Sequence, residues 1–155
     1  MALIAAGSHA PDFCLADENG DLHRLSELLQ QGPVVVYFYP KDDTPGCTAE
    51  ACKFRDDYED FTAAGARVLG ISTDGAASHL AFKAKHRLPF SLLSDPDGGV
   101  ARKFGVKKLL GLLPGRATFV IDREGVVRHS FSSQIDMHAH VERALAVLRQ
   151  LSPAS

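Results

Sequence analysis

Residues 34–47 of the chain, VVVYFYPKDDTPGC, predict a buried strand that leads through a short loop into a helix. Residues 34–39 contain only β-branched and aromatic side chains without polar alternation, which is typical of a strand buried on both faces. Pro40 ends this run. Threonine is favoured at the N-cap of a helix and proline at its first position, so Thr44 and Pro45 predict that a helix begins at Pro45.

The segments on either side of this stretch alternate between strand and helix patterns. On the N-terminal side, residues 12–16 predict a strand that enters a tight turn at 19–20, and Ser26 begins a short helix through Gln30. On the C-terminal side we expect helices at 45–64, 76–86, 97–104 and 138–151, strands at 67–72 and 89–93, and a hairpin of 117–121 with 126–131. This order predicts an α/β fold, a thioredoxin-like sandwich in which helices cover both faces of a mixed central sheet.

Length and charge favour a single globular domain over residues 1–155. The chain has 155 residues and a formal net charge of −2, from 17 basic and 19 acidic side chains. This near balance gives no electrostatic footprint for nucleic acid or for an anionic membrane. No apolar run approaches the roughly 20 residues that span a bilayer, and residues 1–7 lack the pattern of a secretory signal. We therefore expect a cytoplasmic protein that binds neither nucleic acid nor membranes.

The three cysteines, Cys14, Cys47 and Cys52, are too few for a disulfide scaffold. Cys47 falls at the third position of the helix that begins at Pro45, where its backbone N–H has no partner within the helix. The positive end of a helix dipole favours the thiolate form of a cysteine placed there. A reactive thiol and an inert core residue both fit this position.

Helical spacing places Cys47 and Cys52 on different sides of the same helix. The apolar stripe consists of Cys47, Ala51, Phe54, Tyr58 and Phe61. The polar side holds Cys52, Arg55, Asp56 and Glu59. We expect a buried Cys47 and an exposed Cys52, as in a site that divides attack and resolution between two thiols. A small core residue and a chance surface cysteine fit the same spacing.

An intact helix keeps these two thiols apart. Five residues along an ideal helix give a rise of about 7.5 Å and a rotation of about 140°, which separates the two Cα atoms by about 8.6 Å. A disulfide requires Cα atoms within about 7 Å of each other. If Cys47 and Cys52 pair, the first turn of the helix must therefore unwind.

Residues 38–50, FYPKDDTPGCTAE, followed by FRD at 54–56, resemble the active-site segment of peroxiredoxins. Within them they resemble the peroxiredoxin Q group, also called bacterioferritin comigratory proteins. The family pattern Pro-x-x-x-Thr-x-x-Cys falls on Pro40, Thr44 and Cys47, and the active-site arginine of the family falls on Arg116. The resemblance covers most of the chain in the right order, through the segments 70–74, 78–79, 88–95, 104–106 and 116–122.

The resemblance implies a thioredoxin-like fold with an N-terminal β-hairpin extension and a role in antioxidant defence. It implies a thiol-specific peroxidase that reduces hydrogen peroxide and organic hydroperoxides through a sulfenic acid on Cys47. Cys52 would resolve this acid as a Cys47–Cys52 disulfide, which thioredoxin or a similar dithiol would reduce. No metal or organic cofactor is needed, and we expect a monomer or a weak dimer. Thr44, Arg116 and the Cys47 N–H are the donors expected to stabilise the reacting oxygens.

Some residues depart from the family or have no role in it. The segment 107–115 is shorter than in many members, and some relatives carry the resolving cysteine in the following helix, where residues 76–86 contain none. Cys14 has no family role and is expected to be a buried strand residue. Glu50 is expected in the first helical turn, where a carboxylate complements the helix dipole, and it could also order the region of Lys41 and Arg55.

Two other functions and a metal site compete with this interpretation. A disulfide oxidoreductase acting on proteins usually carries a Cys-x-x-Cys motif, which the chain lacks. A peroxide sensor could use a Cys47–Cys52 disulfide to alter a surface, and turnover with peroxide and a dithiol would distinguish it from an enzyme. His138 and His140 do not share a helical face, and no carboxylate or cysteine completes a set with them, so we expect no metal site.

Overall fold

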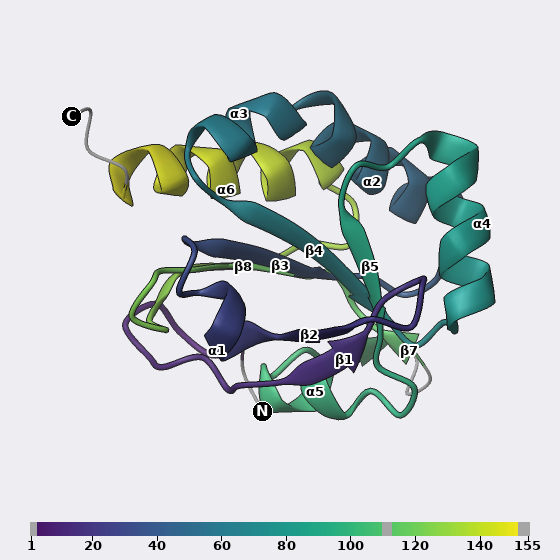
Figure 1. The fold of residues 1–155 in the computed structure, drawn as a ribbon, viewed down its shortest axis with the longest axis horizontal. Helices are drawn as coiled ribbons and strands as arrows, with labels where there is room; N and C mark the ends of the chain where they lie inside the picture. The colour runs from purple at the N-terminus through teal and green to yellow at the C-terminus, as the bar shows by residue number, and fades with distance from the viewer. Residues whose placement is uncertain (1–2, 110–112, 152–155) are drawn as a thin grey trace.

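The computed structural model describes residues 3–109 and 113–151, and its centre is a five-stranded mixed sheet (Figure 1). The strand order is β5-β4-β3-β8-β9. The strands are β3 (Val34–Phe38), β4 (Arg67–Ser72), β5 (Ser91–Ser94), β8 (Ala117–Ile121) and β9 (Val127–Ser132). β4 pairs in parallel with β3 and β5, whereas β8 pairs antiparallel with β3 and β9. The predicted mixed sheet is confirmed.

Helices cover both faces of this sheet, as predicted. They are α1 (Leu25–Leu28), α2 (Pro45–Asp56), α3 (Tyr58–Ala63), α4 (Ala76–His86), α5 (Gly99–Lys103) and α6 (Met137–Leu151). Figure 1 shows α2, α3 and α6 on one side of the sheet and α1 and α5 on the other. Alternate residues of β3 enter the two cores: Val35 and Tyr37 pack with α2 and α6, and Val34 and Phe38 pack with α1 and α5. Every residue of β3 is buried, as its unbroken apolar sequence predicts.

The N-terminal extension is the expected hairpin. β1 (Cys14–Ala16) pairs antiparallel with β2 (Leu22–Arg24), and the turn between them contains Gly20 at φ +84°. The predicted burial of Cys14 is wrong, because its side chain is only half-buried. β1 and β2 form a separate two-stranded sheet, and all three residues of β1 are half-buried in it.

The helix predicted over 45–64 is two helices. Asp57 leaves the helical region between α2 and α3, with φ −98° and ψ 9°. Its N–H still donates to the Lys53 carbonyl at 3.1 Å, so the chain bends without ending its hydrogen bonding. The buried rings of Phe54 and Phe61 lie 5.5 Å apart across this bend. No glycine or proline stands at the break, which is why the sequence pattern alone did not reveal it.

Smaller differences concern β5 and the segment 107–115. The strand predicted at 89–93 begins at Ser91 instead, consistent with the absence of an N–H on Pro89 for the sheet ladder. The segment 107–115 contains a short antiparallel pair, β6 (Lys108–Leu109) with β7 (Leu113–Pro114), and residues 110–112 between them lie outside the described range. In the described ranges, no helix is long and apolar enough to cross a membrane.

Candidate active site

Cys47 lies at the N-terminus of α2, in the position predicted for it. Thr44 occupies the N-cap with an extended backbone, and Pro45 is the first helical residue. The Thr48 N–H donates to the Thr44 carbonyl at 2.8 Å, which closes the first turn. The Cys47 N–H therefore has no acceptor within the helix. The side chain of Cys47 is 1% exposed, so the predicted burial is confirmed.

Arg116 places its positive charge against the sulfur of Cys47. Its Nη1 donates to Cys47 Sγ at 3.1 Å, and the residue is buried. Two hydrogen bonds fix the backbone of Arg116. Its N–H donates to Gln134 Oε1 at 3.3 Å, and Ser132 Oγ donates to its carbonyl at 2.8 Å. A cation next to a thiol stabilises the thiolate, which is the nucleophilic form.

Gly46 is required for the close approach of Arg116 to α2. A Cβ at this position would lie 2.6 Å from Arg116 Nη2 and 3.2 Å from Met137 Cε. Any side chain at residue 46 must therefore displace the guanidinium. Glycine also weakens the first turn of the helix, so this residue serves both the geometry of the site and its flexibility.

Glu50 faces the site instead of complementing the helix dipole, so the expectation for this residue is wrong. It lies beyond the first turn of α2, is fully buried, and its Oε1 lies 3.4 Å from Arg116 Nη1. Burial raises the pKa of Glu50 to about 8, although the Arg116 charge opposes this shift. The carboxyl group is therefore predominantly uncharged at neutral pH.

His140 of α6 lies behind Glu50 and is also fully buried. Its Nε2 is 2.8 Å from the Ser133 carbonyl, and its Nδ1 is 2.8 Å from Thr118 Oγ1. Because a carbonyl only accepts, Nε2 carries a hydrogen. Burial lowers the pKa of His140, and the Arg116 charge lowers it further, so the ring is neutral at neutral pH.

The loop between β3 and α2 contains the other two predicted site residues. Pro40 is buried two residues after the end of β3. Thr44 Oγ1 donates to the Lys41 carbonyl at 2.9 Å and makes no capping bond to α2. The buried Asp42 carboxylate accepts from Ser78 Oγ at 2.8 Å and lies 2.7 Å from His79 Nδ1, which ties this loop to α4.

Cys52 lies further along the same helix as Cys47. Its side chain is half-buried, less exposed than predicted, and both thiols are free. α2 is continuous from Pro45 to Asp56, so the separation of about 8.6 Å expected for an ideal helix applies to this pair. A disulfide between them requires that the helix opens first.

Comparison with known proteins identifies the family. Residues 6–130 match the AhpC/TSA family, and chloroplastic peroxiredoxin Q of Oryza sativa subsp. japonica is 50% identical over 149 residues, 96% of this chain and 68% of the relative. The chain is a peroxiredoxin of the AhpC/TSA family. Chloroplastic peroxiredoxin Q of Suaeda salsa is 49% identical over 152 residues, 97% of this chain and 71% of the relative. The protein is therefore a thiol peroxidase that acts on hydroperoxides.

Solved structures of peroxiredoxins share the fold. Peroxidoxin BcpB from Mycobacterium tuberculosis is 45% identical, with a TM-score of 0.89 over 97% of this chain and 99% of that one. Peroxiredoxin Q from Xanthomonas campestris is 33% identical, with a TM-score of 0.82 over 90% and 91% of the two chains. The predicted thioredoxin-like fold is confirmed, whereas the assignment of residues 1–155 to one domain stays a prediction.

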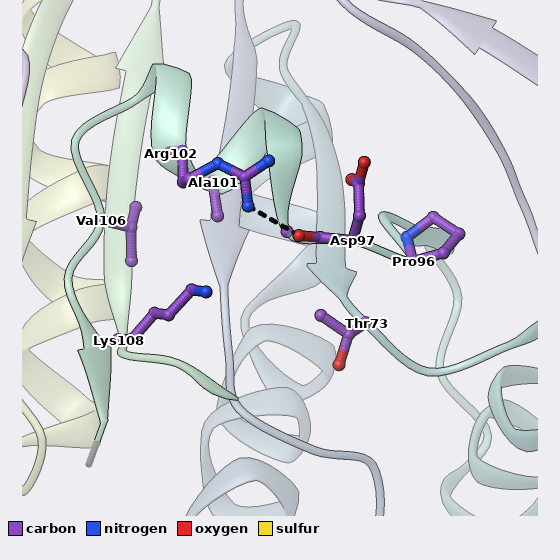
Figure 2. A pocket seen from close by; sticks show the side chains of 8 residues that line it. Thr73, Pro96, Asp97, Ala101, Arg102, Val106 and Lys108 are labelled. Atoms are coloured by element: carbon purple, nitrogen blue, oxygen red, sulfur yellow. Dashed lines mark hydrogen bonds between the residues drawn. The ribbon is translucent and has the colours of Figure 1, made fainter. Parts of the chain in front are cut away.

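The cavity shown in Figure 2 is not part of the peroxiredoxin site. It has a volume of about 140 Å³ and lies between α5 and the segment after β4, with Thr73, Ala101 and Lys108 in its lining. Arg102 Nη1 donates across it to the Asp97 carbonyl at 2.7 Å. None of the predicted site residues lines this cavity.

The two histidines considered for a metal site differ in their exposure to solvent. His138 is exposed and His140 is buried, although only one residue stands between them on α6. In residues 3–109 and 113–151, no group of three His, Cys, Asp or Glu side chains could hold a metal ion.

Sequence reasoning named Glu50 and His140 but placed neither of them in the site. Glu50 stands three residues after Cys47, a spacing that places both on one face of a helix. His140 stands four residues before Ala144 and eight before Leu148, which are both buried. These spacings could have placed both polar side chains on apolar faces, where a carboxylate and an imidazole need partners.

Proposed function

We propose that this peroxiredoxin reduces hydroperoxides with Cys47 as the attacking thiol and Cys52 as the resolving thiol. The observation that carries the proposal is the contact of 3.1 Å between Arg116 Nη1 and Cys47 Sγ at the N-terminus of α2. In this contact the buried sulfur lies next to a fixed cation and at the positive end of the α2 helix dipole. Both features stabilise negative charge where the reaction begins.

In the first step the Cys47 thiolate attacks one oxygen of the peroxide. A sulfur–oxygen bond forms, the oxygen–oxygen bond breaks, and its electron pair leaves on the second oxygen, which takes up a proton as water or alcohol. Cys47 becomes a sulfenic acid. Arg116 and the Cys47 N–H can donate to the reacting oxygens, and Thr44 can do so by releasing the Lys41 carbonyl.

In the second step the Cys52 thiol condenses with the sulfenic acid. A disulfide forms and water leaves. An external dithiol such as thioredoxin then reduces this disulfide by thiol–disulfide exchange and is itself oxidised. The bacterioferritin comigratory protein of Xanthomonas campestris has been studied for alkyl peroxide reduction. We extend that substrate class to this chain, beside hydrogen peroxide. A monomer or weak dimer and a cytoplasmic location stay predictions.

Mass spectrometry after one equivalent of hydrogen peroxide tests this assignment. Wild-type protein is expected to yield a peptide linked through Cys47 and Cys52, with Cys14 still reduced. Cys52→Ser is expected to accumulate a sulfenic acid on Cys47 that a thiol probe can trap. Oxidation that appears first on Cys14 or Cys52 would contradict the proposal, whereas one stoichiometric oxidation without turnover on added dithiol would favour the sensor.

Amide exchange is expected to reveal the opening of α2. In the disulfide form the amides of residues 46–52 should exchange faster than in the reduced form, because the first turns must unwind before the two sulfurs meet. Residues 54–61, whose Phe54 and Phe61 are fully buried, should keep their protection. α6 serves as an internal control. Equal protection of residues 46–52 in a confirmed Cys47–Cys52 disulfide would contradict the unwinding step.

A further inference from the structure

The two carboxyl oxygens of Glu50 lie in different surroundings. Oε1 is 3.4 Å from Arg116 Nη1, at the long end of the hydrogen-bond range. Oε2 is buried and makes no hydrogen bond among the described residues, and it lies 3.6 Å from His140 Nδ1. An ionised carboxylate with one weakly bound and one unbound oxygen is costly in a dry site. The contacts therefore fit a carboxylic acid better than a carboxylate.

The orientation of His140 explains why it does not donate to Glu50. A neutral imidazole carries one ring hydrogen, and Nε2 uses it for the Ser133 carbonyl at 2.8 Å. Nδ1 therefore presents a lone pair, to which the Thr118 hydroxyl, 2.8 Å away, can donate. Because Thr118 occupies this lone pair, Nδ1 has no hydrogen to offer Oε2, and it disfavours a carboxylate there.

We propose that His140 is a positioning residue of the peroxidase site: its Nδ1 has no hydrogen to donate, which keeps Glu50 a carboxylic acid and thereby leaves the Arg116 charge to the Cys47 sulfur. Thr118 and Ser133 fix the ring for this purpose. If Glu50 ionises, its carboxylate shares the Arg116 charge, and the thiolate and the leaving oxygen lose part of their stabilisation. The inference rests on Cys47 as the attacking thiol, but the protonation of Glu50 can be measured independently of that assignment.

Groups from four elements face Glu50. Cys47 lies on the same helix, Arg116 precedes β8, His140 comes from α6, and Tyr37 comes from β3. The pKa of Tyr37 is raised well above its ordinary value, by burial first and then by Glu50 and Cys47, so this hydroxyl stays neutral.

Further charged groups affect the pKa of His140. Asp136 favours the protonated ring, whereas Arg116 and His129 oppose it. Tyr37 and His140 are both neutral, so among these three groups Glu50 is the one whose charge changes near pH 8.

The pH dependence of the first step tests the proposal. In single-turnover oxidation of the reduced full-length protein by hydrogen peroxide, the wild-type rate constant is expected to fall as the pH rises through about 8. A fall of about tenfold is expected, less than the loss of a donor outright. Glu50→Gln carries an uncharged amide at every pH and is expected to lose this fall. His138→Asn, an exposed histidine on the same helix, should follow the wild-type profile.

Infrared spectroscopy of the reduced protein gives a readout that does not depend on activity. A carboxylic acid carbonyl band is expected at pH 7 in wild type, absent in Glu50→Gln, and lost from wild type as the pH rises through about 8. In His140→Asn the amide can donate to Oε2, so the loss of the band and the fall in rate should both move down by about one pH unit, tenfold in the ionisation equilibrium.

Two results would overturn the proposal. The first is that wild type at pH 7 shows no carboxylic acid band that disappears in Glu50→Gln. The second is that Glu50→Gln keeps the fall in rate at alkaline pH. If His140→Asn fails to fold, the titration of the Glu50 band in wild type still decides the protonation state. If oxidation does not involve Cys47 but the Glu50 band behaves as expected, the proposed function fails instead.

Discussion

Cys47→Ser is expected to lose peroxidase activity by at least about 1,000-fold, the scale seen when an enzyme loses its nucleophile. The first step oxidises sulfur by two electrons and leaves an oxygen atom on it, a change that a serine hydroxyl cannot undergo. Serine is similar in size, and the buried position at the start of α2 can accept it, so the fold should persist. The measurement is steady-state turnover of hydrogen peroxide with a dithiol reductant, together with circular dichroism of the variant.

Cys14→Ser is the matched control for this prediction. Cys14 is half-buried in the N-terminal hairpin, on a sheet separate from the one that leads into α2. Its replacement should leave turnover within about twofold of wild type, since serine is similar in size and residue 14 is half-buried and outside the site. If Cys47→Ser keeps wild-type turnover while Cys14→Ser loses it, the attacking thiol has been assigned to the wrong residue.

Much of the fold could be predicted from the sequence because its strongest signals are local. The unbroken apolar run of β3 and the Thr44-Pro45 start of α2 each depend on neighbouring residues, and both are confirmed. The break at Asp57 could not be found in this way, because no glycine or proline marks it. The short pair of β6 and β7 was also missed, since strands of two residues are too brief to show a hydrophobic period.

The site was predictable only in part, because its contacts join distant segments. The motif that contains Pro40, Thr44 and Cys47 is continuous in the chain, and the resemblance added Arg116. Glu50 was assigned to the helix dipole because its partner His140 stands 90 positions away on α6. Thr44 illustrates a different difficulty, since its side chain could have capped α2 but instead donates to the Lys41 carbonyl.

Arg116→Ala is expected to slow the oxidation of Cys47 by hydrogen peroxide by about 100-fold, near 3 kcal/mol of transition-state stabilisation. The guanidinium lies 3.1 Å from the sulfur, and its removal takes away the cation that faces both the thiolate and the leaving oxygen. Arg116→Lys should recover only part of the rate, because an ammonium group is a compact point charge without the fixed planar donors of the guanidinium, whose Nη1 contacts both Cys47 and Glu50. Stopped-flow measurement of Cys47 oxidation gives the rate constants.

Gly46→Ala tests whether the position of the Arg116 charge matters, because the variant moves the guanidinium without removing it. The new Cβ would meet Arg116 Nη2 at 2.6 Å, so the guanidinium must move while it remains in the protein. If the contact with the sulfur carries the effect, Gly46→Ala should slow the oxidation by about tenfold, between wild type and Arg116→Ala. Gly75→Ala is the matched control, since no atom lies within 4 Å of a Cβ at that position and φ is not positive there. A full rate in Gly46→Ala beside a loss in Arg116→Ala would mean that the charge acts from a distance and that the contact itself contributes nothing.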